Sequence, residues 1–166
     1  MRLLPVVSST IVALLVAAGS AATGQVTITI GGATGPAGGA VSVPITLSGI
    51  AAGGVAVNNA QLDIIFDTAF FETPAPTTDC VPDPRFGSSN GFLASEGLPT
   101  VSGVQRIRLS VIDNTEPLGG VTDGLMFTCT LHLKSTATGT TTLTATRLNV
   151  GDTSGNVLTS AGVNGT

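Results

Sequence analysis

The side chains able to carry covalent or acid–base chemistry are few in this chain and lie far apart. Among its 166 residues are two cysteines, Cys80 and Cys129, a single histidine, His132, and 10 acidic residues. Nucleophilic catalysis needs a base within reach of the nucleophile, and the sequence has neither a Gly-x-Ser-x-Gly elbow nor a His-Glu-x-x-His motif. No pair of acidic residues stands out among aromatic residues that could line a glycosidase cleft. We therefore predict no catalytic residues and no enzyme activity.

The two cysteines allow two interpretations. A disulfide between Cys80 and Cys129 would close a loop of about 50 residues and stabilise the fold by about 4 kcal/mol in the chain-entropy description. The alternative is one buried thiol at Cys129, which lies in an alternating segment, and one exposed thiol at Cys80. We predict the disulfide, because the N-terminus indicates export and an exported chain with two cysteines usually pairs them.

Metal binding has weak support. His132 has no second histidine near it and is expected to be a surface residue. Loop carboxylates can hold Ca²⁺, and two groups are candidates: Asp79 with Asp83, and Asp113 with Glu116 and Asp123. Neither group has EF-hand spacing, and loop acids are most often simply solvated. We therefore predict no metal and no other cofactor, with structural Ca²⁺ in these loops as the alternative.

Residues 1–22 have the layout of a secretory signal peptide. Met1-Arg2 is followed by a largely apolar run, Leu3–Ala18, and then by small residues, with cleavage expected after Ala21 or Ala22. The run is short for a membrane anchor, and no basic stop-transfer cluster follows it. We predict a single domain over 23–166 that is secreted and lies outside the cell or on its surface.

Composition narrows the class of partner. The formal net charge is −4 and only 10% of residues are charged, so the chain lacks the basic patch that nucleic acids or anionic membranes attract. Trp and Tyr, the usual platforms for sugar rings, are absent. Phe86 and Phe92 are the only loop aromatic residues that could replace them. Asn164-Gly165-Thr166 also matches the acceptor pattern for N-glycosylation.

Apolar and polar residues alternate along several segments, which is typical of strands with one buried face. In the strand that ends at Phe66, the expected internal residues are Ala60, Leu62, Ile64 and Phe66. In Gly124–Lys134 they are Leu125, Phe127, Cys129, Leu131 and Leu133, which leaves Met126 on the outer face. Val41–Leu47 also alternates, but Pro44 cannot donate a ladder hydrogen bond, so we expect this strand at or near a sheet edge.

Two segments depart from the alternation. Thr73–Ser102 is rich in proline and is predicted to form an ordered excursion or a short extra hairpin. A phase slip within Thr140–Val150 predicts a β-bulge at Arg147. In total, about eight or nine short strands joined by Gly-rich turns predict an all-β, antiparallel sandwich or barrel.

Four stretches, in this order, resemble the cohesin domains of cellulosome scaffolds and their relatives outside cellulosomes. Ile28–Ile30 with Pro36–Ile45 resembles the opening strand, Gly-rich turn and Val-x-Val-Pro strand of that family. Leu62–Glu72 resembles its aromatic-Asp-Pro-x-x-Leu turn, with Thr68 in place of Pro and Phe71 in place of Leu. The remaining two stretches, which resemble its Gly-x-Leu-Phe-x-Ile-x-Phe-Lys strand and its closing turn and strand, are Gly124–Lys134 and Asp152–Val157 with Gly162–Gly165.

The resemblance implies a nine-stranded jelly-roll sandwich over 23–166 and a non-catalytic recognition module. By analogy with the family, one sheet face would dock a protein partner of dockerin type. The candidate contact residues, on the solvent faces of two strands, are Arg106, Arg108 and Ser110, or Thr128, Thr130 and His132. Two alternatives remain: a polysaccharide-binding module that uses Phe86 and Phe92, and a structural spacer of a surface protein.

Overall fold

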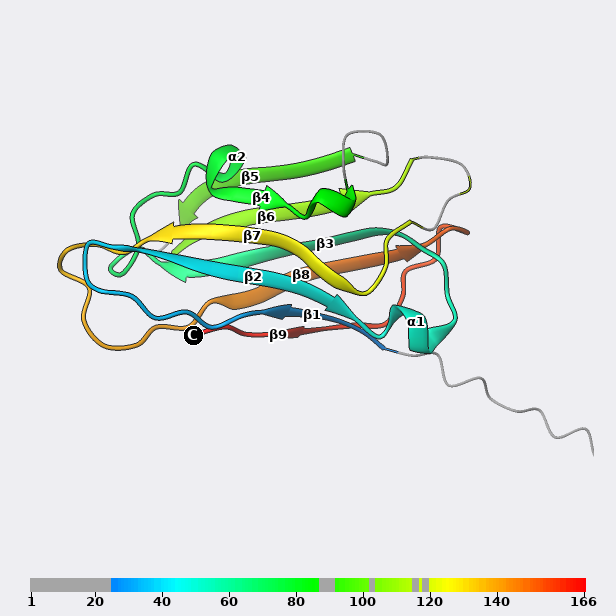
Figure 1. Ribbon diagram of the computed structural model, residues 1–166, viewed down its shortest axis with the longest axis horizontal. Helices are drawn as coiled ribbons and strands as arrows, with labels where there is room; N and C mark the ends of the chain where they lie inside the picture. The colour runs from blue at the N-terminus through cyan, green and yellow to red at the C-terminus, as the bar shows by residue number, and fades with distance from the viewer. Residues whose placement is uncertain (1–24, 87–91, 102–103, 115–116, 118–119) are drawn as a thin grey trace, which may run out of the picture.

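Two β-sheets pack face to face in the computed structural model and form a sandwich (Figure 1). The structure describes residues 25–166 except 87–91, 102–103, 115–116 and 118–119, so the predicted signal peptide lies outside the described residues. The five-stranded sheet has the order β4 (Cys80–Pro82), β7 (Gly124–His132), β2 (Ala40–Ser48), β1 (Val26–Ile30), β9 (Ser160–Val163). The four-stranded sheet has the order β5 (Phe92–Val101), β6 (Val104–Ile112), β3 (Val57–Asp67), β8 (Thr144–Asp152). The predicted all-β sandwich is confirmed.

Neighbouring strands are antiparallel except for one pair. β9 runs parallel to β1, with Val26 opposite Ser160 and Thr29 opposite Val163. Among the residues described, three short helices connect the strands: α1 (Ile50–Gly53), α2 (Pro76–Asp79) and the 3₁₀ helix η1 (Pro84–Phe86). No helix in the described part of the chain is long and apolar enough to cross a membrane.

The hydrophobic core lies between the sheets and is built from alternate residues of their strands. In β3 the predicted internal residues are buried as expected, each at most 2% exposed: Ala60, Leu62, Ile64 and Phe66. Phe66 also meets Phe71 edge to face, with ring centroids 5.7 Å apart. The alternation of apolar and polar residues along each strand therefore determines which face of each sheet packs in the core.

β7 departs from the prediction at two neighbouring residues. Leu125, expected on the inner face, is only half-buried and lies opposite Thr46. Met126, expected on the outer face, is fully buried beside Phe127. The pairing with β2 shifts at this point, because Ile45 lies opposite Phe127 while Thr46 lies opposite Leu125. Met126 is the extra residue of a β-bulge, and a bulge breaks the alternation of faces.

The predicted edge position of β2 is wrong, since β2 lies in the middle of its sheet between β7 and β1. Pro44 is tolerated there because β1 ends at Ile30, opposite Ile45. The Pro44 carbonyl still accepts a hydrogen bond from the Gly31 amide at 2.8 Å. An N–H at this position would face the same side as the carbonyl, so proline loses only the reciprocal bond to Gly31, just beyond the last residue pair with β1.

The segment Thr73–Ser102 is more regular than predicted. It contains α2, β4 and η1, and then β5, which forms the edge of the four-stranded sheet. Pro99 fits there because β5 has a neighbour only on one side and its register with β6 shifts between Leu98 and Val101. β4 pairs with β7 so that Cys80 lies directly opposite Cys129, and the two form the predicted disulfide.

The predicted bulge in β8 is confirmed. The register between β3 and β8 shifts where Gln61 lies opposite Asn149 and Asp63 lies opposite Thr146. Arg147 lies within this shift and has a positive φ of 48°, which is uncommon for a residue other than glycine. The bulge brings the Arg147 side chain close to the centre of the neighbouring strand β3, where it matters for the site described next.

Candidate functional site

The outward surface of the four-stranded sheet, called here the β6 face, brings one of the two predicted residue sets together. In β6, Arg106, Arg108 and Ser110 alternate with the buried Ile107 and Leu109. Each lies opposite a β3 residue that also faces outward: Ile65, Asp63 and Gln61, respectively. Cross-strand neighbours of this kind have Cβ atoms within about 5.5 Å of each other. The β6 face is therefore a continuous surface of paired side chains.

An ion pair lies at the centre of the β6 face. The Arg108 guanidinium donates from Nε to Asp63 Oδ1 at 2.7 Å and from Nη2 to Asp63 Oδ2 at 3.0 Å. Arg147 Nε lies 3.9 Å from Asp63 Oδ2, on the opposite side from Arg108. The Asp63 side chain is fully buried, although the sequence predicts it on the solvent side, because these two arginines cover it. A bidentate pair of this geometry fixes the orientation of both groups.

Beside the ion pair is a shallow hollow of about 230 Å³ on the same face. Its outward-facing members are the polar side chains of Asn59, Gln61, Ser110 and Asn149 and the half-buried Ile112. Ser110 donates from its hydroxyl to Gln61 Oε1 at 3.1 Å and is only 7% exposed, so it is not the solvent-facing residue that the sequence predicts. Gly151 leaves room for the Asn59 amide, since a Cβ at Gly151 would lie 2.3 Å from Asn59 Nδ2.

Strand β5 extends the β6 face on its far side. Its register places Leu98 opposite Arg106, Glu96 opposite Arg108 and Phe92 opposite Ile112. Phe92 thus begins a strand and is not the loop residue that the sequence predicts. The side chains of β5 lie outside the described residues.

The second predicted set lies on the other side of the molecule. Thr128, Thr130 and His132 face outward from β7 in the five-stranded sheet, opposite Pro44, Ser42 and Ala40 of β2. His132 is exposed and the two threonines are half-buried. The outer surfaces of the two sheets point in opposite directions. A single flat partner surface therefore cannot contact both these residues and Arg106.

Phe86 cannot serve as a platform for a sugar ring. It lies in η1 and is 7% exposed. The Arg85 guanidinium carbon stands 4.5 Å from the centroid of its ring, so one face of Phe86 is covered by a cation. The prediction that Phe86 is an available loop aromatic residue is wrong.

The candidate calcium ligands that the structure describes accept hydrogen bonds from backbone amides. Asp123 accepts from the Ile50 and Ala51 amides at the start of α1, at 2.8 and 3.2 Å. Asp113 accepts from Gly120, Asp79 from Ala75 and Asp83 from Arg85. Glu116 lies outside the described residues, and among those described no three His, Cys, Asp or Glu residues form a group that could hold a metal. Asn164, the predicted glycosylation acceptor, is exposed, and its Oδ1 accepts from the Ala145 amide at 2.9 Å.

The sequence alone does not reveal which residues neighbouring strands contribute to the β6 face. Asn59, Gln61 and Asp63 show only that one side of β3 is polar, and nothing local marks Arg147 as their neighbour. The phase slip at Arg147 is the one signal that could have indicated the ion pair, because a bulge redirects a side chain.

Comparison with known proteins identifies relatives of the whole domain. The cohesin domain family matches residues 26–166. Similar solved structures include CaCohA2 from Clostridium acetobutylicum, which is 21% identical over 87% of this chain and 91% of its own, with a TM-score of 0.65. Another is a non-cellulosomal cohesin from the hyperthermophilic archaeon Archaeoglobus fulgidus, which is 20% identical over 85% and 88%, with a TM-score of 0.60.

A third structure shows a relative with its partner. It is the Coh-OlpA–Doc918 type I cohesin–dockerin complex from Clostridium thermocellum, 16% identical over 85% of this chain and 96% of the other, with a TM-score of 0.64. No curated protein sequence matches the chain. At these identities the solved structures support the fold, whereas the match to residues 26–166 shows the family.

Proposed function

The chain belongs to the cohesin domain family, and from this we infer that it is an exported, non-catalytic module that binds a dockerin-type protein domain. The family match over nearly all of the described residues is the observation that carries this proposal. The Coh-OlpA–Doc918 complex supports the choice of partner, since a cohesin of the same fold is bound there to a dockerin.

We place the docking surface on the β6 face, where the polar groups are held in fixed positions before a partner arrives. The Asp63–Arg108 pair and the Gln61–Ser110 hydrogen bond each join β3 to β6. Fixed side chains lose little conformational entropy on binding, which favours affinity. Around them stand half-buried apolar residues, Ile65 and Ile112, and the exposed Arg147. A mixture of apolar and polar groups around arginine is typical of protein interfaces.

The outer face of β7 is the less favoured surface. Its candidates Thr128 and Thr130 form no side-chain network in the described part of the chain, and His132 lies at the end of its strand. Threonine is also under-represented among residues that dominate binding energy. The spacer alternative predicts that neither face binds anything.

The test is a capture experiment followed by measurement of affinity. Immobilised 23–166 is incubated with the secreted proteins of its own organism, retained proteins are identified by mass spectrometry, and a dockerin-like candidate is titrated by calorimetry. A variant with Arg106→Glu and Arg147→Glu should lose at least about 100-fold in affinity, because charge reversals at the centre of an interface remove contacts and add repulsion. Neither substitution removes Asp63 or Arg108.

The matched control carries Thr130→Glu and His132→Glu on the opposite face. It should bind within about threefold of the wild type. Loss of binding in the control with retention in the arginine variant would move the docking surface to β7. The result would contradict the proposed function itself if no dockerin-like protein were captured and 23–166 were instead retained on insoluble polysaccharide in a parallel pull-down.

A further inference from the structure

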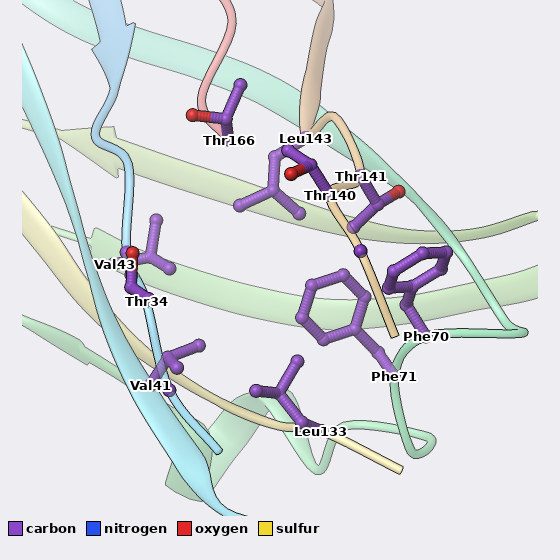
Figure 2. A pocket seen from close by; sticks show the side chains of 13 residues that line it. Thr34, Val41, Val43, Phe70, Phe71, Leu133, Thr140, Thr141, Leu143 and Thr166 are labelled. Atoms are coloured by element: carbon purple, nitrogen blue, oxygen red, sulfur yellow. The ribbon is translucent and has the colours of Figure 1, made fainter. Parts of the chain in front are cut away.

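A cavity at one end of the sandwich, separate from the β6 face, has a lining suited to a small ligand (Figure 2). We propose that this cavity binds a neutral sugar ring. It has a volume of about 300 Å³ and draws its lining from the turn after β3, the loop between β1 and β2, and the segment before β8. It shares no residue with the hollow on the β6 face.

The floor of the cavity is apolar and firmly packed. Val43, Phe71 and Leu143 line it, and each is at most 5% exposed. Phe71 is held from behind by its edge-to-face contact with Phe66. Water over such a floor lacks hydrogen-bonding partners on that side, so a ligand that covers the floor with C–H groups gains free energy by displacing it.

Phe70 supplies a partly exposed aromatic wall. In Figure 2 the rings of Phe70 and Phe71 stand next to each other on one side of the cavity, and Thr34 and Val41 stand on the other. The Phe70 backbone is fixed at both polar groups: its N–H donates to the Asp67 carbonyl at 3.1 Å, and its carbonyl accepts from the Lys134 amide at 2.8 Å. The backbone that carries the ring is therefore held in place, which lowers the entropic cost of binding.

Threonine hydroxyls stand at the mouth of the cavity. Thr34 and Thr140 are exposed and Thr141 is half-buried. In the described part of the chain, none of these three hydroxyls forms an intramolecular hydrogen bond. The segment that carries Thr140 and Thr141 is anchored by two backbone bonds between Leu143 and Gly165, at 2.9 and 3.0 Å. Each hydroxyl can donate and accept, as can each hydroxyl of a sugar.

The lining also limits the charge and size of the ligand. No Asp, Glu, Lys, Arg or His is among the described residues that line the cavity, so no charged side chain there would compensate a charged ligand. The volume is at the lower end of small-ligand sites, about 300–1,000 Å³, which suits one ring better than a chain lying lengthwise. A neutral ring with an apolar C–H face and hydroxyls at its edge matches the floor, the Phe70 wall and the threonine rim together.

Saturation-transfer NMR on 23–166 tests this proposal. The probes are glucose, xylose, mannose and their short oligomers, with cyclohexylmethanol as a less polar probe of similar size. We expect transfer to the ring C–H protons of at least one sugar. Phe70→Leu should abolish that transfer. The double variant Thr140→Val and Thr141→Val, which keeps the side-chain shape, should weaken the affinity about tenfold or more.

The double variant Arg106→Glu and Arg147→Glu is the control, and it should leave sugar binding unchanged. Circular dichroism of each variant checks that the domain is folded. Absence of transfer to every sugar would overturn the proposal. The proposal would be overturned in favour of an apolar occupant if the wild type bound no sugar and the Thr140→Val, Thr141→Val variant bound cyclohexylmethanol more tightly than the wild type does.

Discussion

At the scale of single residues, the Asp63 carboxylate is fully buried while its two arginine neighbours are exposed to different extents. The Arg108 side chain is 27% exposed and makes two short hydrogen bonds to Asp63, whereas that of Arg147 is 65% exposed and lies 3.9 Å away. A buried charge is stabilised most by a partner that is also shielded from water, because solvent screens its interaction with an exposed partner. Arg108 should therefore carry most of the compensation.

This asymmetry predicts different costs for removing each arginine. Arg108→Gln should lower the free energy of unfolding by about 3 kcal/mol, near the low end for leaving a buried charge without its partner. Arg147→Gln should cost less than about 1 kcal/mol, as is usual for an exposed ion pair. Urea unfolding of the two variants and the wild type, in the same buffer, measures both. Equal losses would mean that Arg147 contributes as much as Arg108 to holding the buried carboxylate.

At the scale of secondary-structure elements, the turn after β8 depends on one carboxylate. Asp152 Oδ1 accepts from the Ser154 and Asn156 amides, each at 2.8 Å, and Oδ2 accepts from Asn156 Nδ2 at 2.9 Å. These hydrogen bonds, that from the Asn156 side chain most of all, lower the pKa of Asp152 below its usual value of 3.8. Hydrogen bonds to the charged form have this effect because protonation weakens them.

The lowered pKa gives a pH dependence of known sign. In the unfolded chain Asp152 has its ordinary pKa, so its contribution to stability is full above about pH 4 and is lost as pH falls through the lower folded-state pKa. Asp152→Asn has no charge to lose. The difference in unfolding midpoint between wild type and this variant should therefore be constant from pH 7 to about pH 5 and shrink at lower pH. A difference that stays the same down to pH 2.5 would contradict this account.

At the scale of the whole molecule, the sequence predicts what depends on local periodicity. The internal faces of β3 and most of β7, the bulge at Arg147 and the disulfide follow from alternation, a phase slip and cysteine usage. β5 was not predicted, because Gly97 and Pro99 interrupt its pattern and an edge strand tolerates both. The central position of β2 depends on where β1 ends, which Pro44 itself does not reveal.

The candidate sites were harder to predict because each joins segments distant in sequence. Asp63 and Arg108 are 45 positions apart and meet only through the register of β3 with β6. Phe70 and Thr141 line one cavity although they are 71 positions apart in the sequence. Local patterns cannot establish such registers, since a shift by one residue exchanges the two faces of a strand.

Export and folding are linked in the whole molecule through the disulfide. β4 has only three residues, and the Cys80–Cys129 bond ties it, with α2 and η1, to β7 at a sequence separation of 49. If residues 1–22 direct export, the exported protein should begin at Ala22 or Thr23 and contain no free thiol, because disulfides form in oxidising compartments. The same domain produced without its leader in a reducing cytoplasm should keep both thiols and unfold at a lower temperature.

The size of that difference can be estimated. A loop of this length contributes about 4 kcal/mol in the chain-entropy description, and native disulfides typically contribute 2–5 kcal/mol, so the thiol form should melt roughly 10 °C lower. Thiol labelling, N-terminal sequencing and calorimetry of both preparations give the three measurements, and Cys80→Ser with Cys129→Ser provides the matched control. That variant should melt at the temperature of the thiol form from either compartment. An exported protein that keeps residues 1–22 would contradict cleavage of the leader, whereas equal melting temperatures would show that β4 is held by its pairing with β7 alone.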